Sequence, residues 1–192
     1  MRRIKKKQNT NSGKFWDGFY SENEESSLAA RRQIYYEHVD RYLEDGKHSL
    51  LDIGCGFGNG LAYIQSQKHD YNLNGCDLSS IAIEKAQKYH RDINFFVFDI
   101  YKDSLNKLYD YILIIETLEH IEKPYKQIDK ILKFCNRLII SMPYMSTLKK
   151  DPEHIITNVN EDSFSRYNVL DTSVWNKTDR PNKKYITVML EG

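Results

Sequence analysis

The stretch Leu50-Leu51-Asp52-Ile53-Gly54-Cys55-Gly56-Phe57-Gly58-Asn59-Gly60 decides the fold of this chain. It opens with a short apolar run and continues with four glycines at alternate positions, a pattern typical of a turn between a β-strand and an α-helix. Such glycines let the backbone bend sharply and let a ligand approach main-chain N–H groups. The dinucleotide fingerprint Gly-x-Gly-x-x-Gly fails here in both possible registers. Asp52 is therefore predicted to lie beside a positively charged or hydroxyl-bearing ligand rather than a pyrophosphate.

Short apolar segments alternate with helical patterns on both sides of this loop. Strands that are apolar throughout and alternate with helices predict a parallel sheet covered on both faces. The predicted strands are residues 49–53, 72–76, 94–98, 109–115 and 137–142. The predicted helices are residues 28–43, 59–67, 81–90 with Ser79 as N-cap, and 123–134.

The last part of the chain has a different pattern. A short helix is predicted over 161–167, capped by Asn160, and two strands are predicted over 169–175 and 184–190. Because a polar turn separates these two strands, we expect an antiparallel hairpin appended to the parallel sheet. The aromatic cluster at 15–20 is predicted to pack on the body or to close over a ligand.

Length and charge indicate one domain with a basic tail. The chain has 192 residues, 40% of them hydrophobic, and a net charge of +1. Six of its 28 Lys and Arg residues lie within the first 14 positions, so the remainder carries 22 basic residues against 27 acidic ones, about −5. We expect a flexible basic tail over 1–14 and a single domain over 15–192. Nucleic acid is not the favoured partner, because its binders usually carry positive charge on the folded surface.

The sequence also bears on location. Its longest apolar run, residues 111–115, is far below the roughly 18 residues that a membrane span needs. The basic start leads into polar residues, unlike a signal peptide. Three cysteines without a Cys-x-x-Cys pair argue against a disulfide framework. These features predict a cytoplasmic protein without a transmembrane segment.

The glycine loop and the acid before it closely resemble the nucleotide-binding loop of class I S-adenosylmethionine-dependent methyltransferases, and the resemblance covers about residues 15–141. It implies a Rossmann-like α/β sheet, mostly parallel, and S-adenosylmethionine as cofactor with S-adenosylhomocysteine as product. Asp77 would accept hydrogen bonds from both ribose hydroxyls, because a carboxylate offers two acceptor oxygens. Asp99 would bind the adenine amino group, with Ile100 against the ring. The implied cofactor-binding set is Asp52, Gly54, Gly56, Gly58, Asp77, Leu78, Asp99, Ile100 and Glu116.

A second constellation follows the fourth predicted strand. If the chain turns helical there, Glu116, Glu119 and His120 stand at i, i+3 and i+4 and converge. His154, in the loop beyond the fifth strand, is predicted to return to the same pocket. Carboxylates and imidazoles together can hold Mg²⁺ or Mn²⁺, so Glu116, Glu119, His120 and His154 are a candidate metal set. Alternatively, His120 or His154 is a general base, with Glu119 as the third catalytic candidate.

The resemblance implies transfer of a methyl group from a sulfonium to a nucleophile. The same Glu-x-x-Glu-His segment occurs in ubiquinone-biosynthesis O-methyltransferases and in small-RNA terminal 2′-hydroxyl methyltransferases, which use a metal. The segment also occurs in small-molecule methyltransferases that use no known metal. Resemblance to these implies that Glu116 orients the methionine end of the cofactor. The leading hypothesis is methylation of a hydroxyl of a small molecule, such as a sugar, a glycan precursor or a quinone-like metabolite. RNA ribose 2′-O-methylation with a divalent metal and a non-catalytic cofactor-binding module are the alternatives.

Overall fold

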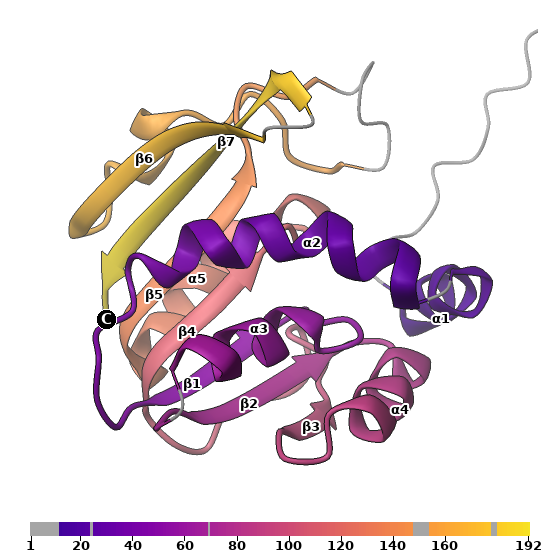
Figure 1. Ribbon diagram of the computed structural model, residues 1–192. Coiled ribbons are helices and arrows are strands. Elements are labelled where there is room, and N and C mark those ends of the chain that lie inside the picture. The colour runs from indigo at the N-terminus through magenta and orange to yellow at the C-terminus, as the bar shows by residue number, and fades with distance from the viewer. Residues whose placement is uncertain (1–11, 24, 69, 148–153, 178–179) are drawn as a thin grey trace, which may run out of the picture.

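A seven-stranded sheet runs through the molecule in the order β3-β2-β1-β4-β5-β7-β6, as Figure 1 shows. The structure is a computed structural model and describes residues 12–23, 25–68, 70–147, 154–177 and 180–192. The strands are β1 (Ser49–Ile53), β2 (Asn72–Asp77), β3 (Asn94–Val97), β4 (Tyr109–Ile115), β5 (Cys135–Pro143), β6 (Val169–Lys177) and β7 (Arg180–Glu191).

Strands β1 to β5 pair in parallel, and the two C-terminal strands are antiparallel. Strand β1 lies in the middle, where Leu51 pairs with Asn74 of β2 and with Ile112 of β4. Because helices cover both faces, these central strands are buried on both sides, which explains their continuous apolar runs. The predicted α/β sheet with a C-terminal hairpin is confirmed.

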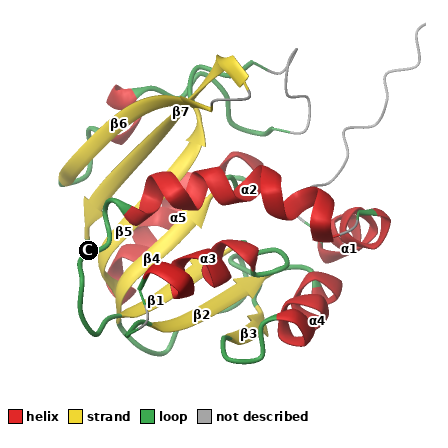
Figure 2. Ribbon diagram, viewed as in Figure 1, coloured by secondary structure: helices red, strands yellow, loops and turns green. Residues whose placement is uncertain are grey.

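The helices form two layers, which Figure 2 shows in red on either side of the sheet. On one face, α2, α3 and α4 contribute Val39, Leu61 and Ile83 to one apolar cluster with the sheet. On the other face, Ile128 and Ile131 of α5 belong to a second cluster. The helices are α1 (Gly13–Glu22), α2 (Glu25–Asp40), α3 (Asn59–Gln67), α4 (Ser80–Tyr89) and α5 (Pro124–Ile131), with 3₁₀ turns η1 (Leu118–His120), η2 (Leu132–Phe134) and η3 (Glu161–Phe164).

Most differences from the sequence expectations concern the ends of elements. The predicted helix 123–134 divides into α5 and the 3₁₀ turn η2, and the helix predicted over 28–43 ends at Asp40. Positions 13 and 14 of the predicted tail, 1–14, belong instead to α1, which begins at Gly13 and is capped by the Ser12 hydroxyl, which accepts from the Phe15 N–H. Residues 1–11 of that tail lie outside the described residues. No helix among the described residues is long and apolar enough to cross a membrane.

Helix α2 packs against the C-terminal hairpin through a histidine. The His38 ring stacks on Trp175 with centroids 4.2 Å apart, and its Nε2 lies 2.9 Å from the Ser173 hydroxyl. The Tyr42 hydroxyl also contacts Ser173, at 2.7 Å. Burial, and then the charge of Arg41, lowers the pKa of His38 from 6.5 to about 4. Protonation of His38 therefore opposes this contact.

We expect His38 to make the free energy of unfolding depend on pH between about 4 and 6.5. In that window the unfolded chain binds a proton that the folded chain does not, so the contribution is complete above pH 6.5 and is lost as pH falls. His38→Phe should remove this part of the slope, on the order of 1 kcal/mol after allowance for screening of a half-buried ring. Urea unfolding at pH 7.5 and 4.5 measures it. Equal slopes in wild type and His38→Phe would contradict the assignment.

Candidate active site

The glycine loop joins β1 to α3 and bends where only glycine fits. Gly54 has φ +86°, and a Cβ built on it would lie 2.3 Å from the Thr117 hydroxyl oxygen. Gly58, the residue before α3, also has a left-handed backbone, with φ +80°. The loop is fixed to the neighbouring strand, since the N–H groups of Gly54 and Cys55 both donate to the Cys76 carbonyl. Because Thr117 follows β4, the close approach of Gly54 to Thr117 also places the glycine loop against the loop after β4.

Asp77 ends β2 and holds two backbone segments together. Its Oδ2 accepts from the Gly56 N–H and its Oδ1 from the Ser79 N–H, both at 2.9 Å. The side chain is buried but lines a pocket. A carboxylate can accept about four hydrogen bonds, so these two contacts are compatible with ligand hydroxyls as further donors.

The pocket lies at the carboxyl ends of the parallel strands, where open α/β sheets bind ligands. It holds about 630 Å³ of space, part of it open to solvent. Six residues expected at the site line it: Gly54, Asp77, Leu78, Ile100, Glu116 and His120. Four aromatic side chains that the sequence analysis did not assign to the site line it too: Trp16, Tyr20, Phe98 and Tyr101. Only the cluster at 15–20 gave a signal for two of them.

Two acids predicted to bind the cofactor, Asp52 and Asp99, are not among the residues that line the pocket in the described part of the chain. Asp52 is buried in the core, where its Oδ2 accepts a 2.6 Å hydrogen bond from the Tyr36 hydroxyl of α2. Asp99 accepts from the Tyr101 N–H and pairs with Lys102 at 2.6 Å. Partial burial acts to raise the pKa of Asp99, but Lys102 and the backbone donors outweigh it, so the pKa of Asp99 is lowered. Their contact with a cofactor stays a prediction.

Glu116 does not lie on a helix, so the expected i, i+3, i+4 convergence is wrong. It follows β4 with φ +49°, a left-handed conformation that is uncommon for a residue with a side chain. Its N–H donates to the Ser141 carbonyl of β5, and the helical turn begins only at Leu118. The backbone at Glu116 therefore departs from helical geometry.

The Glu116 carboxyl lies between pocket and hairpin. Burial, and then the Glu119 carboxylate, raises its pKa well above the ordinary value, while Lys183, Tyr35 and Lys177 act in the opposite direction. Its Oε1 is buried and has no hydrogen-bond partner among the residues that the structure describes. A buried acceptor on a pocket wall fits a ligand that carries a cationic or hydroxyl donor there.

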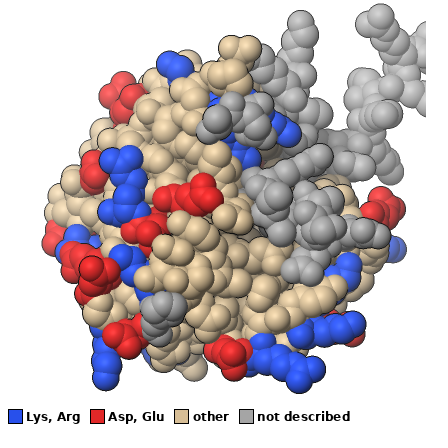
Figure 3. Space-filling view, in the orientation of Figure 1, with Lys and Arg blue, Asp and Glu red and all other residues tan. Residues whose placement is uncertain are grey.

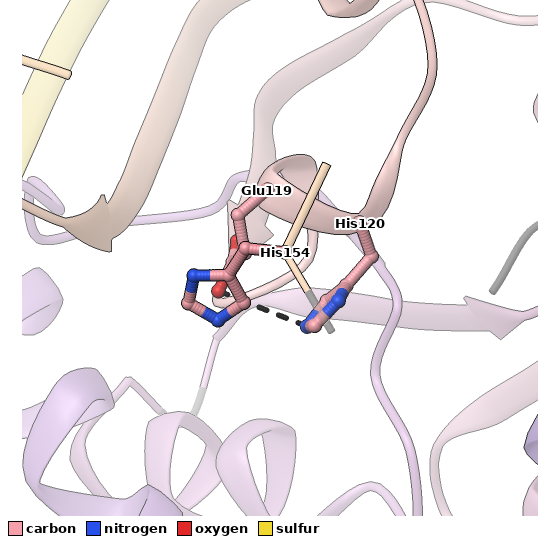
Figure 4. Close-up of side chains that lie close together, drawn as sticks. All are labelled: Glu119, His120 and His154. Atoms are coloured by element: carbon pink, nitrogen blue, oxygen red, sulfur yellow. Dashed lines mark ion pairs between the residues drawn. The ribbon is translucent and has the colours of Figure 1, made fainter. Parts of the chain in front are cut away.

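Three side chains meet beside the pocket, as Figure 4 shows: Glu119, His120 and His154. Their ligand atoms all lie within 4.8 Å of one another, and the two imidazole rings are 5.1 Å apart. His120 Nε2 is 4.0 Å from Glu119 Oε1. The segment after His154 reaches this place because the N–H groups of Ile155 and Ile156 donate to the Glu119 carbonyl.

This trio has two chemical uses. Two imidazole nitrogens and one carboxylate suit Mn²⁺ or another transition metal better than Mg²⁺, which prefers oxygen ligands. The same groups can take up a proton, because an imidazole accepts one near neutral pH and a carboxylate stabilises the resulting charge. Glu116, the fourth member of the predicted metal set, is not part of the trio.

We expect Tyr36→Phe to lower the free energy of unfolding by about 1–3 kcal/mol, because it removes a donor from a buried carboxylate. Urea unfolding measures the change. Tyr89→Phe, at a residue 42% exposed on α4, is the matched control and should be near neutral. If the two variants are equally stable, Tyr36 does not hold α2 to β1 through Asp52.

Known proteins share this domain. Residues 51–139 match the family model described as a methyltransferase domain. The ubiquinone biosynthesis O-methyltransferase of Rickettsia canadensis is 32% identical over 97 residues, which cover 48% of this chain and 40% of that protein. The tRNA N(3)-methylcytidine methyltransferase trm140 of Schizosaccharomyces pombe is 37% identical over 85 residues, covering 41% of this chain and 28% of that protein. The chain spans less than half the length of these curated relatives.

Solved structures share the fold. A methyltransferase in complex with the Haloferax volcanii Trm112 methyltransferase activator superposes with a TM-score of 0.77 at 12% identity, covering 92% of this chain and 96% of that one. Magnesium protoporphyrin IX methyltransferase from Synechocystis PCC 6803, with bound S-adenosylhomocysteine, gives 0.67 at 18% identity, covering 97% and 98%. The chain thus shares the fold of these methyltransferases, and its residues 51–139 are similar in sequence to a methyltransferase domain.

Proposed function

We propose that this chain transfers a methyl group from S-adenosylmethionine to a hydroxyl of a small molecule, such as a sugar, a glycan precursor or a quinone-like metabolite. One observation carries the proposal. One pocket is lined by Gly54 of the glycine loop, by Asp77 and by His120. A cofactor subsite and a proton acceptor thus share one cavity. The resemblance to an O-methyltransferase of ubiquinone biosynthesis supports the choice of a hydroxyl.

The residues at the pocket fit the cofactor. Asp77 would receive the ribose hydroxyls, Ile100 would pack against the adenine, and the buried Oε1 of Glu116 would receive the methionine ammonium. When bound, S-adenosylmethionine supplies a methyl group on a positively charged sulfur that leaves as a neutral thioether. The neighbour from Synechocystis, whose structure contains S-adenosylhomocysteine, supports this assignment.

The chain's own residues would then act on the acceptor. His120 would hold the acceptor hydroxyl and take its proton as the new carbon–oxygen bond forms. Glu119, with Oε1 4.0 Å from His120 Nε2, would stabilise the imidazolium. The aromatic wall of Trp16, Tyr20 and Tyr101 would keep water out and confine donor and acceptor to a reactive alignment.

RNA ribose 2′-O-methylation with a divalent metal is a second candidate, favoured by the close trio of Glu119, His120 and His154. Charge distribution counts against it. Figure 3 shows acidic and basic side chains intermixed along the edge of the face in view, rather than gathered in one basic stripe. A non-catalytic cofactor-binding module is the third candidate, and only turnover separates it from the enzymes.

The deciding experiment supplies the protein with methyl-labelled S-adenosylmethionine and a cell extract, with and without nuclease. Label that survives nuclease in a small-molecule or glycan fraction supports the proposal. Label in a nuclease-sensitive polymer supports the second candidate. Absence of transfer in any fraction, with cofactor binding intact, supports the third.

We expect Asp77→Asn to weaken S-adenosylhomocysteine binding by about ten- to hundredfold, because one charged acceptor oxygen is replaced by an amide donor. Titration calorimetry measures the dissociation constant, and circular dichroism checks that the fold is retained. Asp92→Asn, at an exposed position before β3, should bind like wild type. Equal affinities in all three proteins would show that Asp77 is not the ribose acid.

His120→Ala and His154→Ala test the proton acceptor. We expect at least one of them to lower kcat by about 10²- to 10⁴-fold, the usual range for a lost general base. Wild-type turnover should persist in excess EDTA if the trio works as a base, and should be lost and restored by Mn²⁺ if it binds metal. Full turnover in both variants would remove both roles.

A further inference from the structure

Helix α1, which carries the aromatic cluster at 15–20, forms one wall of the pocket. Two of its side chains, Trp16 and Tyr20, line the cavity. Tyr20 also packs on Phe57 of the glycine loop, with ring centroids 4.9 Å apart, and its carbonyl accepts from the Lys85 ammonium at 2.8 Å. The helix thus contacts both the glycine loop and α4, which also meet each other, since the Lys85 ammonium lies 4.8 Å from the centroid of the Phe57 ring.

One acid fixes α1 to α4. Asp17 Oδ1 accepts from the Ser79 hydroxyl at 2.6 Å and from the Ile81 N–H at 3.3 Å. Ser79 is the N-cap of α4, and its own N–H donates to Asp77. Asp77 therefore accepts from the main-chain N–H of Ser79, and Asp17 accepts from its side-chain hydroxyl. Ser79 thus links Asp17, which anchors α1, to Asp77, which faces the pocket.

Trp16 connects the helix to the proton acceptor. Its ring meets His120 in a T-shaped contact, with centroids 5.2 Å apart and an interplanar angle of 76°. His120 in turn packs edge-on against His154. A rigid indole restricts the rotamers that the imidazole can adopt on that side, so the direction of His120 depends on the position of α1.

We propose that Trp16 is a positioning residue that sets the orientation of His120, and that the contact of Asp17 with Ser79 is a latch that keeps α1 in the place this requires. Without the latch, the pocket would lose part of its Trp16 and Tyr20 wall, and His120 would lose the Trp16 ring beside it. The role of His120 rests on the proposed function, whereas the latch is independent of the acceptor.

The latch is tested by release of S-adenosylhomocysteine. Labelled S-adenosylhomocysteine is bound to the full chain and chased with unlabelled compound, and the dissociation rate is followed. We expect Asp17→Ala to speed release about tenfold, and Gly13→Val to act alike, because a Cβ at Gly13 lies 3.2 Å from the Leu78 carbonyl oxygen. Gly18→Ala is the matched control on the same helix, since a Cβ there meets nothing within 4 Å. Wild-type rates in both latch variants would overturn the latch.

The positioning role is tested by NMR of the imidazole ring protons, with the His120 signals assigned through His120→Gln. Trp16→Leu should move these signals by removing the indole ring current, and Trp16→Phe should restore most of the shift. Trp16→Leu should lower kcat more than it raises the acceptor KM. Unmoved His120 signals in Trp16→Leu would overturn the positioning role. If wild type fails to bind S-adenosylhomocysteine, the proposed function fails, while the NMR arm still decides the contact between Trp16 and His120.

Discussion

The Asp77 carboxylate joins the two turns from which the pocket is built. One oxygen holds the Gly56 N–H of the loop after β1, and the other holds the Ser79 N–H at the start of α4. Without this bridge, the amides would point at an unoccupied gap between neighbouring strand ends, and buried amides without acceptors are costly. Under the proposed function, the same carboxylate that organises the pocket would also receive the ribose, so ligand binding and local folding would share one side chain.

Sequence patterns predicted what depends on local rules. The strands could be predicted because burial on both faces demands continuous apolar runs, and the glycine loop because its left-handed backbone needs residues without Cβ. What could not be predicted depends on contacts between distant residues. Asp52 accepts a hydrogen bond from Tyr36, which lies 16 residues away on α2. Glu116 departs from helical geometry because its N–H pairs with Ser141 of β5. Neither partner carries a sequence signal.

The Glu116 carboxyl is buried close to the Glu119 carboxyl and to two lysines of the C-terminal hairpin. Burial and the Glu119 carboxylate raise the pKa of Glu116, and Lys183 and Lys177 from the hairpin act in the opposite direction. Lys177 itself is buried, with its ammonium 4.0 Å from the centroid of the Tyr35 ring. A cationic ligand would complete this balance. The hairpin therefore contributes to the electrostatics of the pocket, although its strands lie beyond β5 in the sheet.

The strand order has a consequence for the synthesis of the chain. β7 lies between β5 and β6 and pairs with β5 from Arg137 to Pro143. Its residues leave the ribosome after every other described element, so one edge of β5 stays open until about residue 191 has emerged. Pairing over such sequence separation is slow, and an exposed apolar edge invites association with other chains. Nascent chains that stall before β7 would leave this edge of β5 exposed as a template for aggregation.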